Sequence, residues 1–369
     1  MATEWKKVRL GETFTVKKGQ AITKRESKEG PYPVILGGRE PAYFIDRFNH
    51  EGKAIVVSRS GASAGYVSFW NEPIFITDGF LIEPNNDVCY EYIYYLMKNN
   101  QSRFIGSQKG AAIPHVTPAL LSDIDILLPP LETQQKIAGI LSAYDDLIEN
   151  NCKQIKLLEE AAHKLYKEWF VKLNFPGHEN VKIVDGVPEG WKKGKVDDVV
   201  IYHDTKRKPL SSMERSKMKG DYRYYGAASV LDYVNSYLFD GTYLLLGEDG
   251  TVITTDGYPV LQYITGKFWV NNHAHVLTGK NYYSTEFIYM MFSCMKIKDI
   301  VTGAAQPKIS QARLSNKEII LPCEALVRKF SDTTKPIFDK IFNSQLSILN
   351  LQSARDKLLP RLMNVDFEL

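Results

Sequence analysis

The side chains that could perform acid–base chemistry or hold a metal ion fall in three short segments of the second half of the chain. His203-Asp204 could form a base polarised by a carboxylate, and His273-Ala-His275 places two imidazole rings on one face of a strand. Glu248-Asp249 is a further acidic pair, but it does not fit the Asp…Glu-x-Lys pattern of nucleases. No cysteine or acidic partner stands at a metal-like spacing, and histidines of a core or of a cross-strand pair are far commoner. We therefore expect no metal site.

Sequence motifs of several common enzyme classes are absent. There is no GxGxxG motif after a strand, no GxxxxGK[ST] phosphate loop and no HExxH zinc motif. The Asn/Asp-Pro-Pro-aromatic box of amino-methyltransferases does not occur either. The sequence thus favours a binding protein over an enzyme, with no cofactor held by this chain.

Clusters of positive charge mixed with aromatic residues are the remaining chemical signal. The formal net charge of +3 is too small to indicate a nucleic-acid partner by itself. Seven basic residues nevertheless lie from Lys206 to Arg223 against two acidic ones; Tyr222 lies among them, and Tyr224 and Tyr225 follow. Such clusters are often plain solvated surface, but Lys and Arg also bind phosphates, and forked Arg or amide groups read bases. The candidate DNA-contacting residues are Lys17, Lys18, Lys24, Arg25, Arg39, Arg59, Lys109, His115, Lys206, Arg207, Lys208, Arg215, Arg223, Gln306 and Lys308.

The elements that would position these side chains form an internal repeat. Gly110-Ala-Ala-Ile-Pro114 recurs as Gly303-Ala-Ala-Gln-Pro307, a shift of 193 residues (303 − 110). The same shift relates Leu128-Pro129 to Leu321-Pro322. Further upstream the match is looser and the shift varies, as loops of different length would cause. The Gly and Pro residues of the repeated loop are equally suited to plain turn formation.

Two long helices are expected, one at the end of each repeat. Apolar residues at alternating steps of three and four predict a coiled-coil helix after Pro130, and the shift of 193 gives a second, poorer one. Neither helix can bury its apolar stripe alone, so we expect the two to pair antiparallel. One interior position is polar in both helices, either because an open seam tolerates it or because it fixes the register. The expected seam residues are Ile148, Asn151, Ile155, Leu158, Leu165, Ile341, Ser344, Ile348, Leu351 and Leu358.

The domain organisation follows from length and texture. A chain of 369 residues is too long for one ordinary core. Residues 1–130 and 177–323 predict globular domains of mixed α/β (α+β) structure, while 131–176 predict the first helix with a linker and 324–369 the second helix. Four scattered cysteines, no apolar leader and no apolar run of about 18 residues indicate a reduced, cytoplasmic protein without a membrane span.

These features together resemble the specificity subunit of type I restriction–modification systems. The segments that carry the likeness, besides the two Gly-Ala-Ala loops, are Leu131-Glu-Thr-Gln-Gln-Lys-Ile137, Lys167-Glu-Trp-Phe170, Pro188-Glu-Gly-Trp191 and Lys357-Leu-Leu-Pro-Arg-Leu-Met363. The resemblance implies two target-recognition domains, each reading one half of a bipartite DNA sequence. It also implies that the antiparallel helices fix the unread gap between the half-sites.

The resemblance further implies partners for a chain that is itself non-catalytic. Two modification (methyltransferase) subunits would dock on the helices and carry S-adenosylmethionine, and restriction (endonuclease) subunits would supply cleavage. The alternative is a coiled-coil scaffold that binds only proteins and has no DNA specificity.

Overall fold

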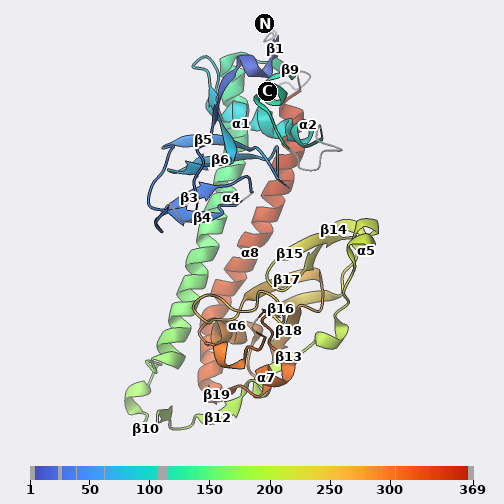
Figure 1. Ribbon diagram of the computed structural model, residues 1–369. Helices are drawn as coiled ribbons and strands as arrows, with labels where there is room; N and C mark the ends of the chain where they lie inside the picture. Colours follow the sequence, from blue (N-terminus) through green and yellow to red (C-terminus); the bar gives the residue numbers. More distant parts are fainter. Residues whose placement is uncertain are drawn as a thin grey trace. The chain divides into compact units, whose positions relative to one another are not determined.

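The computed structural model describes residues 5–23, 27–38, 40–61, 63–106, 115–303 and 305–364 (Figure 1). The chain divides into two compact units, each described by itself below. The first unit comprises residues 1–150 and 347–369, and the second unit comprises residues 151–346. Among the described residues, no helix combines the length and the apolar character that a membrane span requires.

The first unit is built on an antiparallel sheet in the order β2-β8-β5-β6. Its central strand has the sequence Lys-Ala-Ile-Val-Val-Ser, and every residue after the lysine is buried, as expected of a strand covered on both faces. The strands of this unit are β1 (Lys6–Arg9), β2 (Phe14–Lys18), β3 (Tyr32–Ile35), β4 (Tyr43–Ile45), β5 (Lys53–Ser58), β6 (Val67–Asn71), β7 (Phe75–Ile76), β8 (Gly79–Pro84) and β9 (Asp125–Leu128). The short helices are α1 (Tyr90–Asn99), α2 (Gln101–Gly106) and α3 (Pro118–Ser122).

The second unit is built on a larger sheet in the order β13-β18-β16-β17-β14-β15. Its strands are β10 (Ile183–Val184), β11 (Val187–Pro188), β12 (Lys192–Lys195), β13 (Val200–Tyr202), β14 (Lys219–Tyr225), β15 (Val230–Val234), β16 (Phe239–Gly247), β17 (Leu261–Val270), β18 (Ala274–Gly279) and β19 (Glu318–Leu321). The short helices are α5 (Ser212–Lys217), α6 (Thr285–Ser293) and α7 (Gln311–Ser315).

The two units share one framework. The order β2-β8-β5-β6 of the first sheet matches β13-β18-β16-β17 of the second, and the isolated pair β1-β9 matches β12-β19. Helix α1 follows β8 as α6 follows β18, and α3 precedes β9 as α7 precedes β19. The hairpin β14–β15 pairs in parallel with β17, and the hairpin β3–β4 pairs in parallel with β7, so these hairpins are counterparts as well. The repeat predicted from the sequence is therefore a repeat of fold, although the hairpin belongs to the main sheet in the second unit and to a separate three-stranded sheet in the first.

Two long helices, α4 (Leu131–Tyr166) and α8 (Glu324–Leu362), contribute to both units. In the first unit, Leu141 of α4 shares a core cluster with Leu362 of α8, and further along α4 Asp145 meets the earlier residue Arg355 of α8. The two helices therefore run antiparallel in that unit, as Figure 1 also shows, which confirms the expected pairing.

The second unit pairs the remaining parts of the same two helices. Tyr166 and, in the π-helical turn Lys167–Val171 that follows it, Trp169 pack edge to face against Phe330 of α8, with ring centroids 5.7 and 5.8 Å apart. Such aromatic packing anchors the end of α4 against the start of α8 inside the core of this unit.

The residues of the expected helix seam lie on the covered sides of the helices. Ile341 and Ser344 are buried. The others are half-buried, namely Ile148, Asn151, Ile155, Leu158, Leu165, Ile348, Leu351 and Leu358. A polar residue thus occupies a buried position of α8, and the hydroxyl of Ser344 has no hydrogen-bond partner among the described residues.

Candidate nucleic-acid interface

A junction of backbone segments lies just beyond the end of the central strand in the first unit. Ser58, the last residue of β5, pairs with Gly79 of β8. The N–H of the next residue, Arg59, donates to the carbonyl of Asp78 (3.1 Å), and the carbonyl of Arg59 accepts from the N–H of Val116 (2.8 Å). The segment that leads into α3 is thereby fastened to the end of the sheet.

The second unit repeats these contacts bond for bond. Gly247, the last residue of β16, pairs with Ala274 of β18. The N–H of Glu248 donates to the carbonyl of His273 (2.8 Å), and the carbonyl of Glu248 accepts from the N–H of Ile309 (2.8 Å). Glu248 therefore stands where Arg59 stands in the first unit.

Backbone bridges extend the match by one residue on each side. Ser60 bridges to His115, and Asp249 bridges to Lys308. His115 and Lys308 are also related by the sequence shift of 193 (308 − 115). We call this frame the strand-end junction, formed by residues 59, 60 and 115–118 in the first unit and by 248, 249 and 308–311 in the second.

The edge strand next to β8 and the edge strand next to β18 each place one more side chain at the junction. In the first unit Lys18 of β2 lies opposite Phe80 of β8. In the second unit a backbone hydrogen bond from His203 to β18 (2.8 Å) continues the β13–β18 register by one residue and places Asp204 opposite His275. Lys18 and Asp204 are therefore counterparts, as are Phe80 and His275.

The first junction borders an open cavity of about 490 Å³. Three candidate DNA-contacting residues, separated in sequence, meet at this cavity: the exposed Lys18, the partly exposed Arg59 and the exposed His115. Arg59 donates from Nε to Oδ1 of Asp78 (2.7 Å). The described residues of the lining are Val16, Lys18, Arg59, Phe80, His115, Val116, Thr117 and Pro118.

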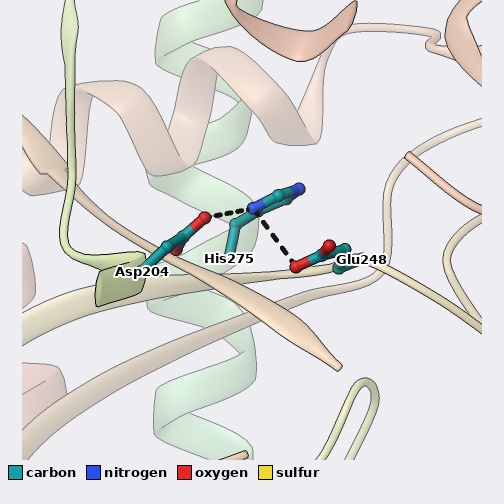
Figure 2. A group of neighbouring side chains, drawn as sticks. All are labelled: Asp204, Glu248 and His275. Atoms are coloured by element: carbon teal, nitrogen blue, oxygen red, sulfur yellow. Dashed lines mark hydrogen bonds and ion pairs between the residues drawn. The ribbon is translucent and has the colours of Figure 1, made fainter. Parts of the chain in front are cut away.

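The second junction is filled by a network of charged side chains (Figure 2). His275 is 1% exposed; its Nδ1 lies 2.6 Å from Oδ2 of Asp204, and its Nε2 lies 2.9 Å from the carbonyl oxygen of Ile309. A carbonyl and a carboxylate can only accept hydrogen bonds, so both ring nitrogens are placed to donate, as in an imidazolium. Asp204, Glu248 and His275 also lie close enough together to hold a metal ion, but both ring nitrogens already face hydrogen-bond acceptors.

Arg207 supplies the second cation of this network. Its Nη1 donates to Oε2 of Glu248 and to the carbonyl of Ala274, both at 2.7 Å, and its Nη2 lies 3.5 Å from Asp204. Burial alone would raise the pKa of Asp204, but the hydrogen bond and charge of His275 together with the charge of Arg207 hold that pKa below its usual value. Two carboxylates thus face two cations, and the network ties three chain segments together.

Two hypotheses that the sequence suggested for these histidines are wrong. His273 and His275 do not face one ligand, because His273 pairs with Asp249 on the exposed side while His275 is buried. His203 does not form a base with Asp204: its Nε2 lies 2.8 Å from the hydroxyl of Thr278. The sequence showed each pair separately and gave no sign that Asp204, Glu248 and His275 converge, since 71 residues separate the first from the last.

The other basic residues of the second unit divide into engaged and exposed ones. Arg215 donates to Asp232 (3.2 Å) and to the carbonyl of Leu210 (2.7 Å), and the half-buried Arg223 donates to the hydroxyl of Tyr225 (3.4 Å). The exposed candidates are Lys206, Lys208, Gln306 and Lys308. Of these, the ammonium of Lys308 lies 3.6 Å from Glu248.

The remaining candidates of the first unit are less informative. Lys17 pairs with Glu83 at 2.8 Å, on the face of β2 opposite to Lys18. The four candidates Lys24, Arg25, Arg39 and Lys109 lie outside the described residues.

One further sequence pattern resembles an enzyme motif. Gly61, Ser63 and Gly65 have the spacing of a GxSxG nucleophile elbow. They lie in the turn between β5 and β6, whereas an elbow requires a strand followed by a helix. Gly61 and Gly65 both have positive φ (81° and 86°), so their role is to form the turn.

Comparisons with known proteins agree with the repeat. A family model described as "Type I restriction modification DNA specificity domain" matches residues 2–160 and 188–325. The MjaIX specificity subunit of a type I restriction enzyme from Methanocaldococcus jannaschii is 30% identical over 84% of this chain and 77% of its own length. The HindI specificity subunit from Haemophilus influenzae is 23% identical over 78% of this chain and 80% of its own length.

A solved structure has the same fold. The crystal structure of a type I restriction–modification S subunit from M. genitalium covers 99% of this chain and 97% of its own, with a TM-score of 0.58 and 19% identity. At that identity the likeness concerns the fold alone.

Proposed function

The chain belongs to the family of type I restriction–modification DNA specificity subunits, and we propose that each of its two units reads one half of a bipartite duplex through the face that carries its strand-end junction. As a specificity subunit it selects the DNA target of a restriction–modification complex and is not itself catalytic. The observation that carries the proposal is the junction: the same backbone frame occurs in both units, and exposed basic side chains belong to it or flank it in each. Two units with similar folds but different side chains are suited to a DNA target with two different halves.

In this proposal the domains have the limits given by the sequence. Residues 1–130 and 177–323 form the target-recognition domains, and residues 131–176 and 324–369 form the spacer helices with their linker. Because α4 and α8 pair antiparallel in each unit, the helices would set the gap between the half-sites.

The DNA contacts we propose in the second unit are the exposed side chains near the junction. Lys206, Lys208 and Lys308 would bind phosphates, and the amide of Gln306 would reach a base edge. We assign Arg207 a structural role, because its guanidinium already serves Glu248, Asp204 and a carbonyl inside the unit.

The partner subunits also belong to the proposal. Two methyltransferase subunits, which would carry S-adenosylmethionine, would dock on the outer sides of the helices, where large apolar side chains are exposed. These side chains are Ile140, Leu147 and Leu157 on α4 and Phe342, Leu346 and Leu349 on α8. Restriction subunits would join the same complex, which would act on DNA in the cytoplasm.

The test is selection from randomised duplex DNA by the chain in complex with its methyltransferase subunits. We expect enrichment of two separated half-sites at a fixed gap, with affinity that falls steeply as salt rises. The double change Lys206→Glu and Lys208→Glu should weaken binding at least tenfold, whereas the control Lys193→Glu, on the exposed strand β12, should change it less than twofold. A protein scaffold without DNA specificity would show no enrichment and no difference between the two variants.

A further inference from the structure

At two positions of their common frame, the strand-end junctions carry side chains of opposite charge. The side chains at each of four equivalent positions differ between the units. The pairs, first unit before second, are Lys18 and Asp204, Arg59 and Glu248, Phe80 and His275, and His115 and Lys308. Where the second unit has two carboxylates, the first has an ammonium and a guanidinium.

The second junction contains its own counter-charges. Arg207 and the imidazolium of His275 lie between the carboxylates of Asp204 and Glu248, so the charges there are balanced within the protein. Balance of this kind is needed because an unpaired charge away from water is costly.

Among the described residues, the first junction has one carboxylate, that of Asp78, for its two cations. Asp78 engages only Nε of Arg59, and no hydrogen bond from the two terminal nitrogens of that guanidinium is found within the described part of the chain. The ammonium of Lys18 likewise forms no ion pair there, and the described residues of the cavity lining include no carboxylate. The site is therefore an open cavity with cations at its wall and room for an anion.

We propose that this cavity binds one phosphodiester group of the DNA backbone, an inference that rests on the proposed function. The terminal nitrogens of Arg59 form a planar fork suited to two phosphate oxygens, and Lys18 adds a mobile point charge. Val16, Phe80 and Pro118 give the cavity an apolar wall, against which the adjoining deoxyribose packs. The phosphate held here fixes the first unit on its half-site without reading a base.

The test compares two exposed lysines of the first sheet in the assembled methyltransferase complex. Lys18→Gln removes the ammonium at the cavity, while Lys53→Gln removes one at the other end of β5 that pairs with Glu91. Anisotropy titrations of a target duplex over a range of salt should show that Lys18→Gln makes the slope of log K against log salt less steep by about 0.9, with Lys53→Gln unchanged. The affinity loss should be equal for the correct duplex and for one with a mismatched half-site.

Methylphosphonate substitution locates the phosphate. Neutralising one phosphate in the half-site of the first unit should weaken binding by wild type but cause no further loss in Lys18→Gln. The phosphate pocket is contradicted if Lys18→Gln leaves the salt slope unchanged, or if its loss of affinity adds to that of methylphosphonate at every phosphate. Neither result contradicts recognition of the duplex by the chain.

Inorganic phosphate distinguishes the two sources of the anion. If phosphate alone binds the wild-type complex in a Lys18-dependent way while the duplex is insensitive to Lys18→Gln, the cavity is a site for a free anion and the DNA assignment is wrong. Absence of duplex binding by wild type contradicts the proposed function itself and the pocket with it.

Discussion

Nη1 of Arg355 on α8 donates to Oδ1 of Asp145 on α4 over 2.5 Å, inside the first unit. The hydroxyl of Tyr95 on α1 donates to the other oxygen of the same carboxylate over 2.6 Å. Three helices thus meet at one carboxylate that is 30% exposed. This partner explains why α8 has a cation at a half-buried position. The shift of 193 relates Asp145 to Phe338, so the second unit has no carboxylate at the equivalent position.

Arg355→Ala should lower the free energy of unfolding by about 1–3 kcal/mol, because it leaves a partly buried carboxylate with only Tyr95 as a partner. Chemical denaturation of the full chain measures this. The control is Arg328→Ala, which removes an exposed i,i+4 pair with Glu324 on the same helix and should cost less than about 0.5 kcal/mol. Equal effects of the two changes would show that Asp145 does not depend on its cation.

Ser344→Ala should raise the free energy of unfolding by about 1 kcal/mol, since the buried hydroxyl has no partner among the described residues and alanine favours the helix. The control Ser353→Ala, on an exposed position of α8, reports the helix-propensity gain alone. A loss of stability or of a unique fold in Ser344→Ala would instead favour the view that this polar position fixes the helix register.

Asp204 predicts a specific acid sensitivity. Its pKa in the folded unit is held below its ordinary value, despite burial, by the hydrogen bond from His275 and the nearby cations. The carboxylate therefore contributes stability that is fully present above about pH 4 to 5 and is lost as the pH falls through the lowered folded pKa. The stability difference between wild type and Asp204→Asn, measured by urea denaturation from pH 6 down to pH 3, should shrink below pH 4. A difference that stays constant over this range would exclude an ionised Asp204 as its source.

His275→Phe places in the second unit the residue type found at the equivalent position of the first. We expect a loss of about 2–4 kcal/mol, because Asp204 and Glu248 keep their charges but lose the imidazolium between them. His273→Phe, two residues earlier and with a side chain that is 47% exposed, should cost less than about 1 kcal/mol. Thermal and chemical unfolding of both variants compare them directly, and a tolerated His275→Phe would mean that Arg207 alone balances the carboxylates.

The helices and the repeat were predictable from sequence because both depend on periodic patterns. Residues such as Ile148, Ile155 and Ile348 recur at coiled-coil spacing, and the shift of 193 relates the loops before each helix. The hairpins β3–β4 and β14–β15 are counterparts in topology, but they lie upstream, where the shift between the repeats varies, so the sequence repeat did not indicate them.

The candidate site was predictable only in part. Lys18, Arg59 and His115 were identified by charge, but their convergence at one cavity depends on strand register and on a loop that docks at the end of the sheet. Charge alone also could not separate Arg207, which is held inside the unit, from Lys206 and Lys208 on either side of it. Burial and pairing decide that difference, and both are products of the tertiary fold.

The central claim, that two units of this chain select a DNA target in two halves, is tested most directly by mapping methylated adenine across the genome of cells that carry the chain with its methyltransferase subunits. The account predicts one bipartite motif with a fixed gap, and exchange of residues 177–323 for those of a related specificity subunit should change one half of that motif only. A single continuous motif, or methylation that is the same without this chain, would contradict it.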